Sequence, residues 1–245
     1  MAARSSKDVA FALVGGYDVL GSLTDLEDTR VAVLERTDAL GDAWEEHTFA
    51  GQRSATLTQS GFFDDAAFAA NQALVSGLGV NSRVAAWAIA GTATGAEFEG
   101  WAGAIETKFE LHAARGELHK ARAEYRNVGP VELGRVVRSY GAAGATGAST
   151  GTPLDNGASS TGVAGYLLGN AAAGESNIRI LDSADNITYA TLLTFTKTSS
   201  GVFAERLTTT GAAQRYIAAD ITTASATGSI ANLNLFVGLV RGLSS

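Results

Sequence analysis

The stretch AIETKFELHA at residues 104–113 decides the fold, because its side chains alternate along the chain. One set consists of Ile105, Thr107, Phe109 and Leu111, and the other of Glu106, Lys108, Glu110 and His112. Alternation with a period of two is typical of a β-strand that has one face buried and the other in water. We therefore expect a strand here, with Glu106 and Glu110 on its wet face.

The sequence on both sides of this strand predicts a sheet-rich protein. A turn at 114–116 and a returning strand at 118–125 complete a hairpin. Similar runs predict strands at 31–35, 55–63, 131–137, 162–168, 177–181, 187–196, 202–208, 214–220 and 231–240. One helix is expected at about residues 64–78, capped by Asp64 and Asp65. The predicted fold class is all-β with one short helix.

Composition divides the chain into two predicted domains. Residues 1–139 hold 19 acidic and 13 basic side chains, whereas the remainder holds 6 and 5, so nearly all of the net charge of −7 lies in the first part. Residues 140–160 are dominated by Gly, Ala, Ser and Thr, which predicts a linker. We expect a β-sandwich at 1–139 and a smaller β-sandwich or jelly roll at 161–245.

The bulk composition excludes several classes of protein. The 245 residues include no cysteine, which excludes disulfides, thiol catalysis and cysteine-ligated metals. The 25 acidic against 18 basic residues argue against a protein that grips nucleic acid by neutralising phosphates. No run approaches the ~20 apolar residues of a membrane helix, and residues 1–7 lack the apolar core of a secretory signal. We expect no association with a membrane.

The short motifs in the chain predict no catalytic or metal site. Residues 147–151 match G-x-S-x-G, but they lie in the linker and all three histidines precede them, unlike in a nucleophile elbow. His112 and His119 flank a turn with no third ligand fixed by spacing. Residues 182–186 resemble a calcium-binding loop but lack the glycine and the terminal glutamate of an EF-hand. We therefore expect no enzyme, cofactor or metal.

Residues 18–65 resemble the beginning of the major tail tube proteins of long-tailed (siphovirus-type) bacteriophages. In that family a loop of the form Asp-x-x-Gly-Asp-x-Trp follows an early strand pair, and a strand and a short helix come next. The loop is matched by Asp38, Gly41, Asp42 and Trp44. The strand and the helix start are matched by Gly51, Thr56, Gly61, Asp64 and Asp65. The continuation also fits, since the resemblance implies a strand pair at 83–89 and 97–108 before the hairpin. The last part resembles an extra β domain that some tail proteins carry outside the tube.

The resemblance implies a structural virion protein whose copies assemble into stacked, six-membered rings that form the tail tube, the conduit for DNA ejection. The implied partners are other copies, other tail proteins, and the tape-measure protein and DNA held in the channel without specific binding. The implied location is the phage tail, after synthesis in the host cytoplasm. The loop at 36–49 is then a contact between rings or subunits, made by Asp38, Leu40, Gly41, Asp42 and Trp44. Trp44 either anchors that contact or covers its own sandwich.

The acidic bias suggests how DNA passes without sticking. Acids on the channel wall repel phosphates, and Glu106 and Glu110 are the candidates for this role. At physiological salt the screening length is ~8 Å, so wall charges act across a thin film of water.

Two alternative functions stay open. The second domain is a candidate module for binding carbohydrate or a host surface, with aromatic side chains that stack on sugar rings: Tyr166, Tyr189, Phe203 and Tyr216. Aromatic residues in sandwich strands are, however, more often core. Alternatively, the chain is a tail-terminator or capsid decoration subunit, which forms a closed ring but no filament.

Overall fold

The computed structural model of the chain describes residues 9, 11–20, 23–36, 47–63, 74–75, 77–79, 83–88, 90–142, 149–150, 152–172, 176–196, 200–223 and 233–243. Regular structure in these ranges is β-strand, except for three helical residues, Leu20, Leu74 and Val75. The all-β fold class is thus confirmed. Most of the predicted helix at 64–78 lies outside the described residues. No helix in the described ranges is long and apolar enough to cross a membrane.

Every strand predicted from alternation overlaps an observed one. The first half contains β1 (Ala12–Val14), β2 (Tyr17–Asp18), β3 (Leu23–Arg36), β4 (His47–Phe62), β5 (Arg83–Ala88), β6 (Glu97–His112), β7 (Lys120–Asn127) and β8 (Val131–Ala142). The second half contains β9 (Ser149–Thr150), β10 (Leu154–Asp155), β11 (Val163–Ala171), β12 (Ser176–Ser183), β13 (Ala190–Thr194), β14 (Gly201–Thr209), β15 (Tyr216–Thr223) and β16 (Leu233–Arg241).

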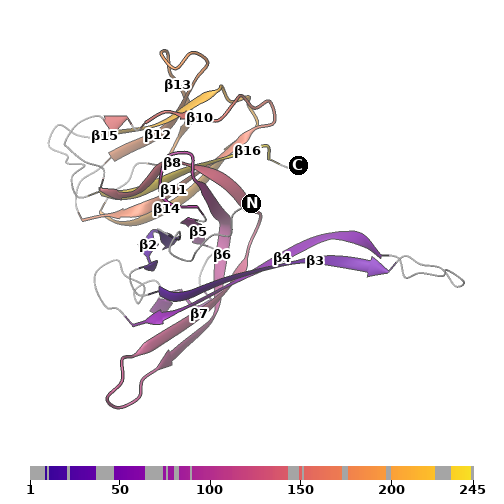
Figure 1. The fold of residues 1–245 in the computed structure, drawn as a ribbon, viewed down its shortest axis with the longest axis vertical. Helices are drawn as coiled ribbons and strands as arrows, with labels where there is room; N and C mark the ends of the chain where they lie inside the picture. Colours follow the sequence, from indigo (N-terminus) through magenta and orange to yellow (C-terminus); the bar gives the residue numbers. More distant parts are fainter. Residues whose placement is uncertain are drawn as a thin grey trace, which may run out of the picture.

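Strand β6 belongs to two parts of the same 11-stranded sheet (Figure 1). One edge of its first half pairs with β5, while its other edge pairs first with β8 and then with β7. The order β2-β1-β5-β6-β8-β16-β11-β14 makes up what we call the curled sheet. The order β6-β7-β4-β3 makes up what we call the open sheet.

The curled sheet closes around an aromatic core. The turn between β1 and β2 packs on β14, since a Cβ added to Gly16 would lie 2.5 Å from the carbonyl oxygen of Phe203. Phe98 of β6 lies at the centre of this core, with its ring centroid 5.0 Å from that of Phe236 and 5.6 Å from that of Tyr166. Edge-to-face contacts of this kind are favourable beyond the area they bury.

A second, 5-stranded sheet of β9, β10, β15, β12 and β13 covers the other face of β8, β11 and β16. The two faces of β11 serve different cores: Val163 and Leu167 point to this second sheet, whereas Ala164 and Leu168 point into the curled sheet. Strands buried on both faces appear in sequence as continuous apolar runs. The second half of the chain therefore forms a β-sandwich together with β8.

The predicted domain boundary at residue 139 falls inside β8. This strand pairs with β16, where Val136 faces Gly238, so one hydrogen-bonded sheet spans both predicted domains. The predicted linker at 140–160 contains β9 and β10, which pair with β15. Whether the two halves fold independently stays a prediction.

The packing around Phe98 gives a test of the curled sheet. A Cβ on Gly238 would lie 2.5 Å from the Phe98 ring and 2.7 Å from the Phe236 ring. Overpacking a close-packed core typically costs about 1–3 kcal/mol. We expect Gly238→Ala to lower the free energy of unfolding by that amount in urea titration. Gly211→Ala is the control, because its Cβ would approach nothing closer than 3.4 Å, the Thr209 hydroxyl oxygen; equal stability of the two variants would contradict this account.

Candidate assembly surface

The open sheet has two edges without a strand partner among the described residues. Its strands pair in the order β6-β7-β4-β3, and every pair is antiparallel. The outer edge of β3 pairs with no described strand, and residues 107–112 of β6 are likewise unpaired on the side away from β7. An unpaired edge exposes a row of backbone donors and acceptors to which another chain can pair. Because the sheet has four strands, β3 and β6 run in opposite directions.

The outward face of the open sheet is hydrophilic. Its centre, on β4, consists of half-buried hydroxyl side chains: Thr56, Thr58 and Ser60. The register places four acids on this face, Asp25, Glu27, Glu110 and Glu124, and four bases, Lys108, Lys120, Arg122 and Arg126. The acidic excess of residues 1–139 is therefore not concentrated on this face of a single chain.

A β-bulge separates the two candidate channel acids. The pairing of β6 with β7 shifts at residue 107, because Glu106 faces Tyr125 and Lys108 faces Glu124. The extra residue reverses the alternation. Glu106 consequently points into the core and is 2% exposed, while Glu110 lies on the outward face and is exposed. The expectation of Glu106 on a wet face is wrong, and the expectation for Glu110 is confirmed.

Glu106 is a buried carboxyl with little compensation for its charge. Among the described residues neither of its carboxylate oxygens has a hydrogen-bond partner, and the nearby Tyr125 hydroxyl has none there either. Burial raises the pKa of Glu106 to about 7, and the positive charge of Arg83 only partly opposes this. Its backbone carbonyl accepts a hydrogen bond of 2.9 Å from the Gly79 N–H.

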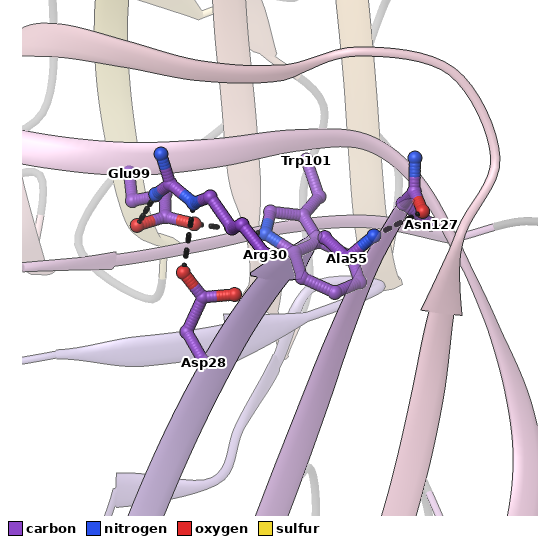
Figure 2. Close-up of polar contacts among 6 residues, drawn as sticks. All are labelled: Asp28, Arg30, Ala55, Glu99, Trp101 and Asn127. Atoms are coloured by element: carbon purple, nitrogen blue, oxygen red, sulfur yellow. Dashed lines mark hydrogen bonds and ion pairs between the residues drawn. The ribbon is translucent and has the colours of Figure 1, made fainter. Parts of the chain in front are cut away.

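A charged cluster holds β3 against β6 at the point where the open sheet leaves the body (Figure 2). Arg30 forms ion pairs with Glu99 and with Asp28, the latter at 2.9 Å. The Trp101 indole N–H donates to Glu99 over 3.0 Å. Burial raises the pKa of Glu99 to about 7, and Asp28 adds to this while Trp101 and Arg30 oppose it. The cluster fixes the base of the β3–β4 hairpin, which projects away from the body (Figure 1).

A groove of about 760 Å³ lies beside this cluster. Four arginines line it: Arg30, Arg53, Arg206 and Arg241. Glu132 forms a bidentate ion pair with Arg206, with N–O distances of 2.5 and 2.9 Å. It also accepts a hydrogen bond from the Tyr166 hydroxyl, with an O–O distance of 2.5 Å. Val31 and Leu133 are exposed at the groove, at 53% and 59%. The groove thus combines arginines, of which Arg30 and Arg206 are ion-paired, with two exposed apolar side chains.

The other predicted residues do not form a site where the structure describes them. The loop with Asp38, Leu40, Gly41, Asp42 and Trp44 lies outside the described residues. The aromatics proposed to stack on sugars do not form one platform, because Tyr166 is fully buried and Phe203 packs against the core. No group of three or more potential metal ligands occurs among the described residues, and His112 and His119 gain no third ligand there.

The loop at 182–186 is an ordered turn between β12 and β13. Asp185 Oδ1 accepts hydrogen bonds of 2.9 Å from the backbone N–H groups of Ile187 and Thr188 and from the Ser183 hydroxyl. These bonds lower the pKa of Asp185 to about 2. An aspartate that caps its own turn in this way explains the motif without calcium.

Sequence comparison assigns no family. No protein-family model and no curated protein matches the chain.

Among the solved structures that match are two of gene transfer agent particles and one of a phage hub protein. The tail of an empty gene transfer agent particle, with C6 symmetry, has a TM-score of 0.41 and 16% identity over 53% of this chain and 98% of that chain. The virion of the native gene transfer agent particle has a TM-score of 0.41 and 16% identity, over 54% of this chain and 98% of that chain. The SPP1 Dit protein has a TM-score of 0.36 and 10% identity, over 95% of this chain and 99% of that chain. It is described as a paradigm of the hub adsorption apparatus in phages that infect Gram-positive bacteria. At these TM-scores no function is carried over.

The burial of Glu106 predicts a pH-dependent stability. Because its pKa is raised from 4.5 to about 7, the protonated carboxyl stabilises the fold fully below pH 4.5, and this stability is lost as the pH rises through about 7. Glu106→Gln keeps the neutral form at every pH. We expect it to raise the free energy of unfolding by about 1–3 kcal/mol at pH 8 and to have little effect at pH 4.

Urea titrations at the two pH values measure this difference. Glu110→Gln is the matched control, since Glu110 lies on the same strand but its pKa is lowered, chiefly by the hydrogen bond from Lys108. Burial of Glu106 would not explain an increase in the free energy of unfolding at pH 8 that is equal for both variants. It would also be contradicted if Glu106→Gln showed no increase at pH 8.

Proposed function

We propose that the chain is a structural subunit of a phage tail tube, in which copies join edge to edge into six-membered rings and the rings stack into a hollow cylinder. The observation that carries the proposal is the open sheet, with its two edges on β3 and β6 that pair with no described strand. A chain with two different open edges joins head to tail, and such joints close into a ring when the rotation between copies allows it. Closure removes both open edges.

The even number of strands supports this arrangement. Since β3 and β6 of one copy are antiparallel, β3 of one copy and β6 of the next are antiparallel when all copies share one orientation. The joint then has the same geometry as every other pair in the sheet. A ring of identical copies thus forms one continuous antiparallel barrel, whose outward-facing polar side chains line the channel in our proposal.

The polar face suits a channel through which DNA moves. Its bases and acids are equal in number. Three of the bases lie on β7, where Arg126 is ion-paired with Glu124 and Arg122 lies opposite Glu110, so these acids offset the positive charge that phosphates would bind. Glu110 is the proposed wall acid. DNA and the tape-measure protein are proposed to pass this wall without specific binding.

The β3–β4 hairpin is the proposed contact between rings. It extends well beyond the body (Figure 1), and the charged cluster around Arg30 braces its base (Figure 2). The loop at its tip contains Asp38, Leu40, Gly41, Asp42 and Trp44. In the proposed tube this loop meets the next ring. The second sheet lies at the opposite end of the molecule from the β6–β7 hairpin, on the proposed exterior of the tube (Figure 1).

The proposal predicts that a lysine at the β6 edge prevents assembly. Leu111 is 48% exposed on this edge and lies on the same face of β6 as Phe109, so a lysine here places a charge on the apolar face of the joint and disfavours pairing with another chain. We expect the native chain to form hollow cylinders with rising concentration in negative-stain microscopy and sedimentation, and Leu111→Lys to stay monomeric. Leu118→Lys is the control, because Leu118 is 70% exposed in the hairpin turn, away from the edge.

Circular dichroism establishes that both variants are folded. A native chain that stays monomeric at high concentration refutes the proposal, as does a Leu111→Lys variant that assembles as readily as Leu118→Lys.

A further inference from the structure

The geometry points to a single register for the joint between two copies, in which Glu27 on β3 lies opposite Lys108 on β6 of the next copy and Leu26 lies opposite Phe109. The partner is a second copy of this chain. The inference deepens the proposed function and rests on it. Three features of the two edges lead to this register: the direction of their backbone groups, the faces of their side chains, and their charges.

The backbone of β3 offers its free groups at alternate residues. The Ala55 N–H donates to Asn127 Oδ1 over 2.7 Å, so it points away from β3 toward β7. Arg30 faces Ala55, and this pair is therefore one of the pairs that exchange no hydrogen bonds. The N–H and C=O groups of Arg30 consequently point to the open edge. With a period of two, those of Asp28 and Leu26 do the same.

The backbone of β6 offers its free groups at the matching positions. The backbone N–H and C=O groups of Ala55 point toward β7, and so do those of Gln59, four residues later on the same strand. Gln59 faces Ala123, so the backbone groups of Ala123 point back toward β4. Phe109 faces Ala123 and therefore directs its N–H and C=O groups to the open edge, as does Leu111 two residues later.

Side chains at these positions share one face of the sheet. Leu26 on β3 and Phe109 on β6 both pack against the core of the open sheet. In a hydrogen-bonded joint the residues that offer backbone groups lie opposite one another. The joint therefore continues the apolar face of one copy into that of the next, and the polar face likewise. If the two edges had opposite phase, every joint would place apolar side chains beside charged ones.

Several registers that differ by two residues keep the apolar side chains on one face, and the charges distinguish between them. With Leu26 opposite Phe109, Glu27 lies opposite Lys108, whose side chain is 54% exposed. Asp25 then lies opposite Glu110, a carboxylate that Lys108 already contacts at 2.8 Å. A slip of two residues in one direction places Glu27 opposite Glu110 and Asp28 opposite Phe109. A slip in the other direction places Asp25 opposite Lys108, but it also places Glu27 opposite Glu106, whose backbone carbonyl already accepts a hydrogen bond from the Gly79 N–H. Opposite charges directly across strands stabilise a sheet and like charges destabilise it, so the first register is favoured.

A charge exchange tests the pair. We expect Lys108→Glu and Glu27→Lys each to raise the concentration needed for assembly by at least about tenfold, because each leaves like charges across every joint. The double variant restores assembly to within about threefold of the native chain. An equimolar mixture of the two single variants also assembles, since every joint between alternating copies again sets one lysine opposite one glutamate. Lys120→Glu on the interior strand β7 is the control and assembles like the native chain.

Cysteine pairs test the register itself, because the chain contains no cysteine of its own. Glu27→Cys with Lys108→Cys is expected to give reductant-sensitive oligomers after oxidation, whereas Glu27→Cys with Glu110→Cys is not. Two results would overturn the register but not the proposed function, provided that the native chain forms cylinders. One is preferential cross-linking of the Glu27→Cys, Glu110→Cys pair; the other is a double charge variant that assembles as poorly as the single variants. A native chain that forms no cylinders overturns the proposed function as well.

Discussion

The structure depends on one long strand that must satisfy two different sheets. In its first half β6 has neighbours on both edges and buries both faces, with Phe98 in the aromatic core and Trp101 on the opposite side. In its second half it has one neighbour among the described strands and one open edge. The bulge at residue 107 lies between the halves. It keeps Glu106 in the core and lets Glu110 reach water, and bulges are typical where a strand changes its role.

An open edge serves assembly only if it is held in a defined position. The Arg30–Glu99 ion pair and the hydrogen bond from Ala55 to Asn127 tie β3 and β4 to the body at the level of the first half of β6 (Figure 2). Leaving a buried partner such as Glu99 uncompensated is strongly unfavourable. The cluster therefore resists any displacement of the hairpin base, so the open edge of β3 is presented in one place.

The alternation of side chains is sufficient to predict the strands, because burial of one or both faces imposes it directly. It misplaces Glu106, since Thr107 carries no mark of a bulge: the residue is neither glycine nor proline, and only pairing with β7 reveals the shift. The boundary at residue 139 follows a real change in composition, yet β8 pairs across it. Contacts between distant strands, such as Arg30 with Glu99, have no periodic signature, and so the base of the hairpin cannot be predicted from the sequence.

In the proposed assembly, the charges of the two edges also favour head-to-tail joining over pairing of like edges. If β3 of one copy paired with β3 of another with Leu26 opposite Leu26, Asp25 of each copy would face Glu27 of the other, and like charges across strands are destabilising. Such a dimer would also leave both β6 edges open. Pairing of β3 with β6 instead sets acids near Lys108 and leaves an edge free at each end until the ring closes. In the proposed ring, the repulsion that disfavours this symmetric dimer is thus the same feature that directs the edges toward closure.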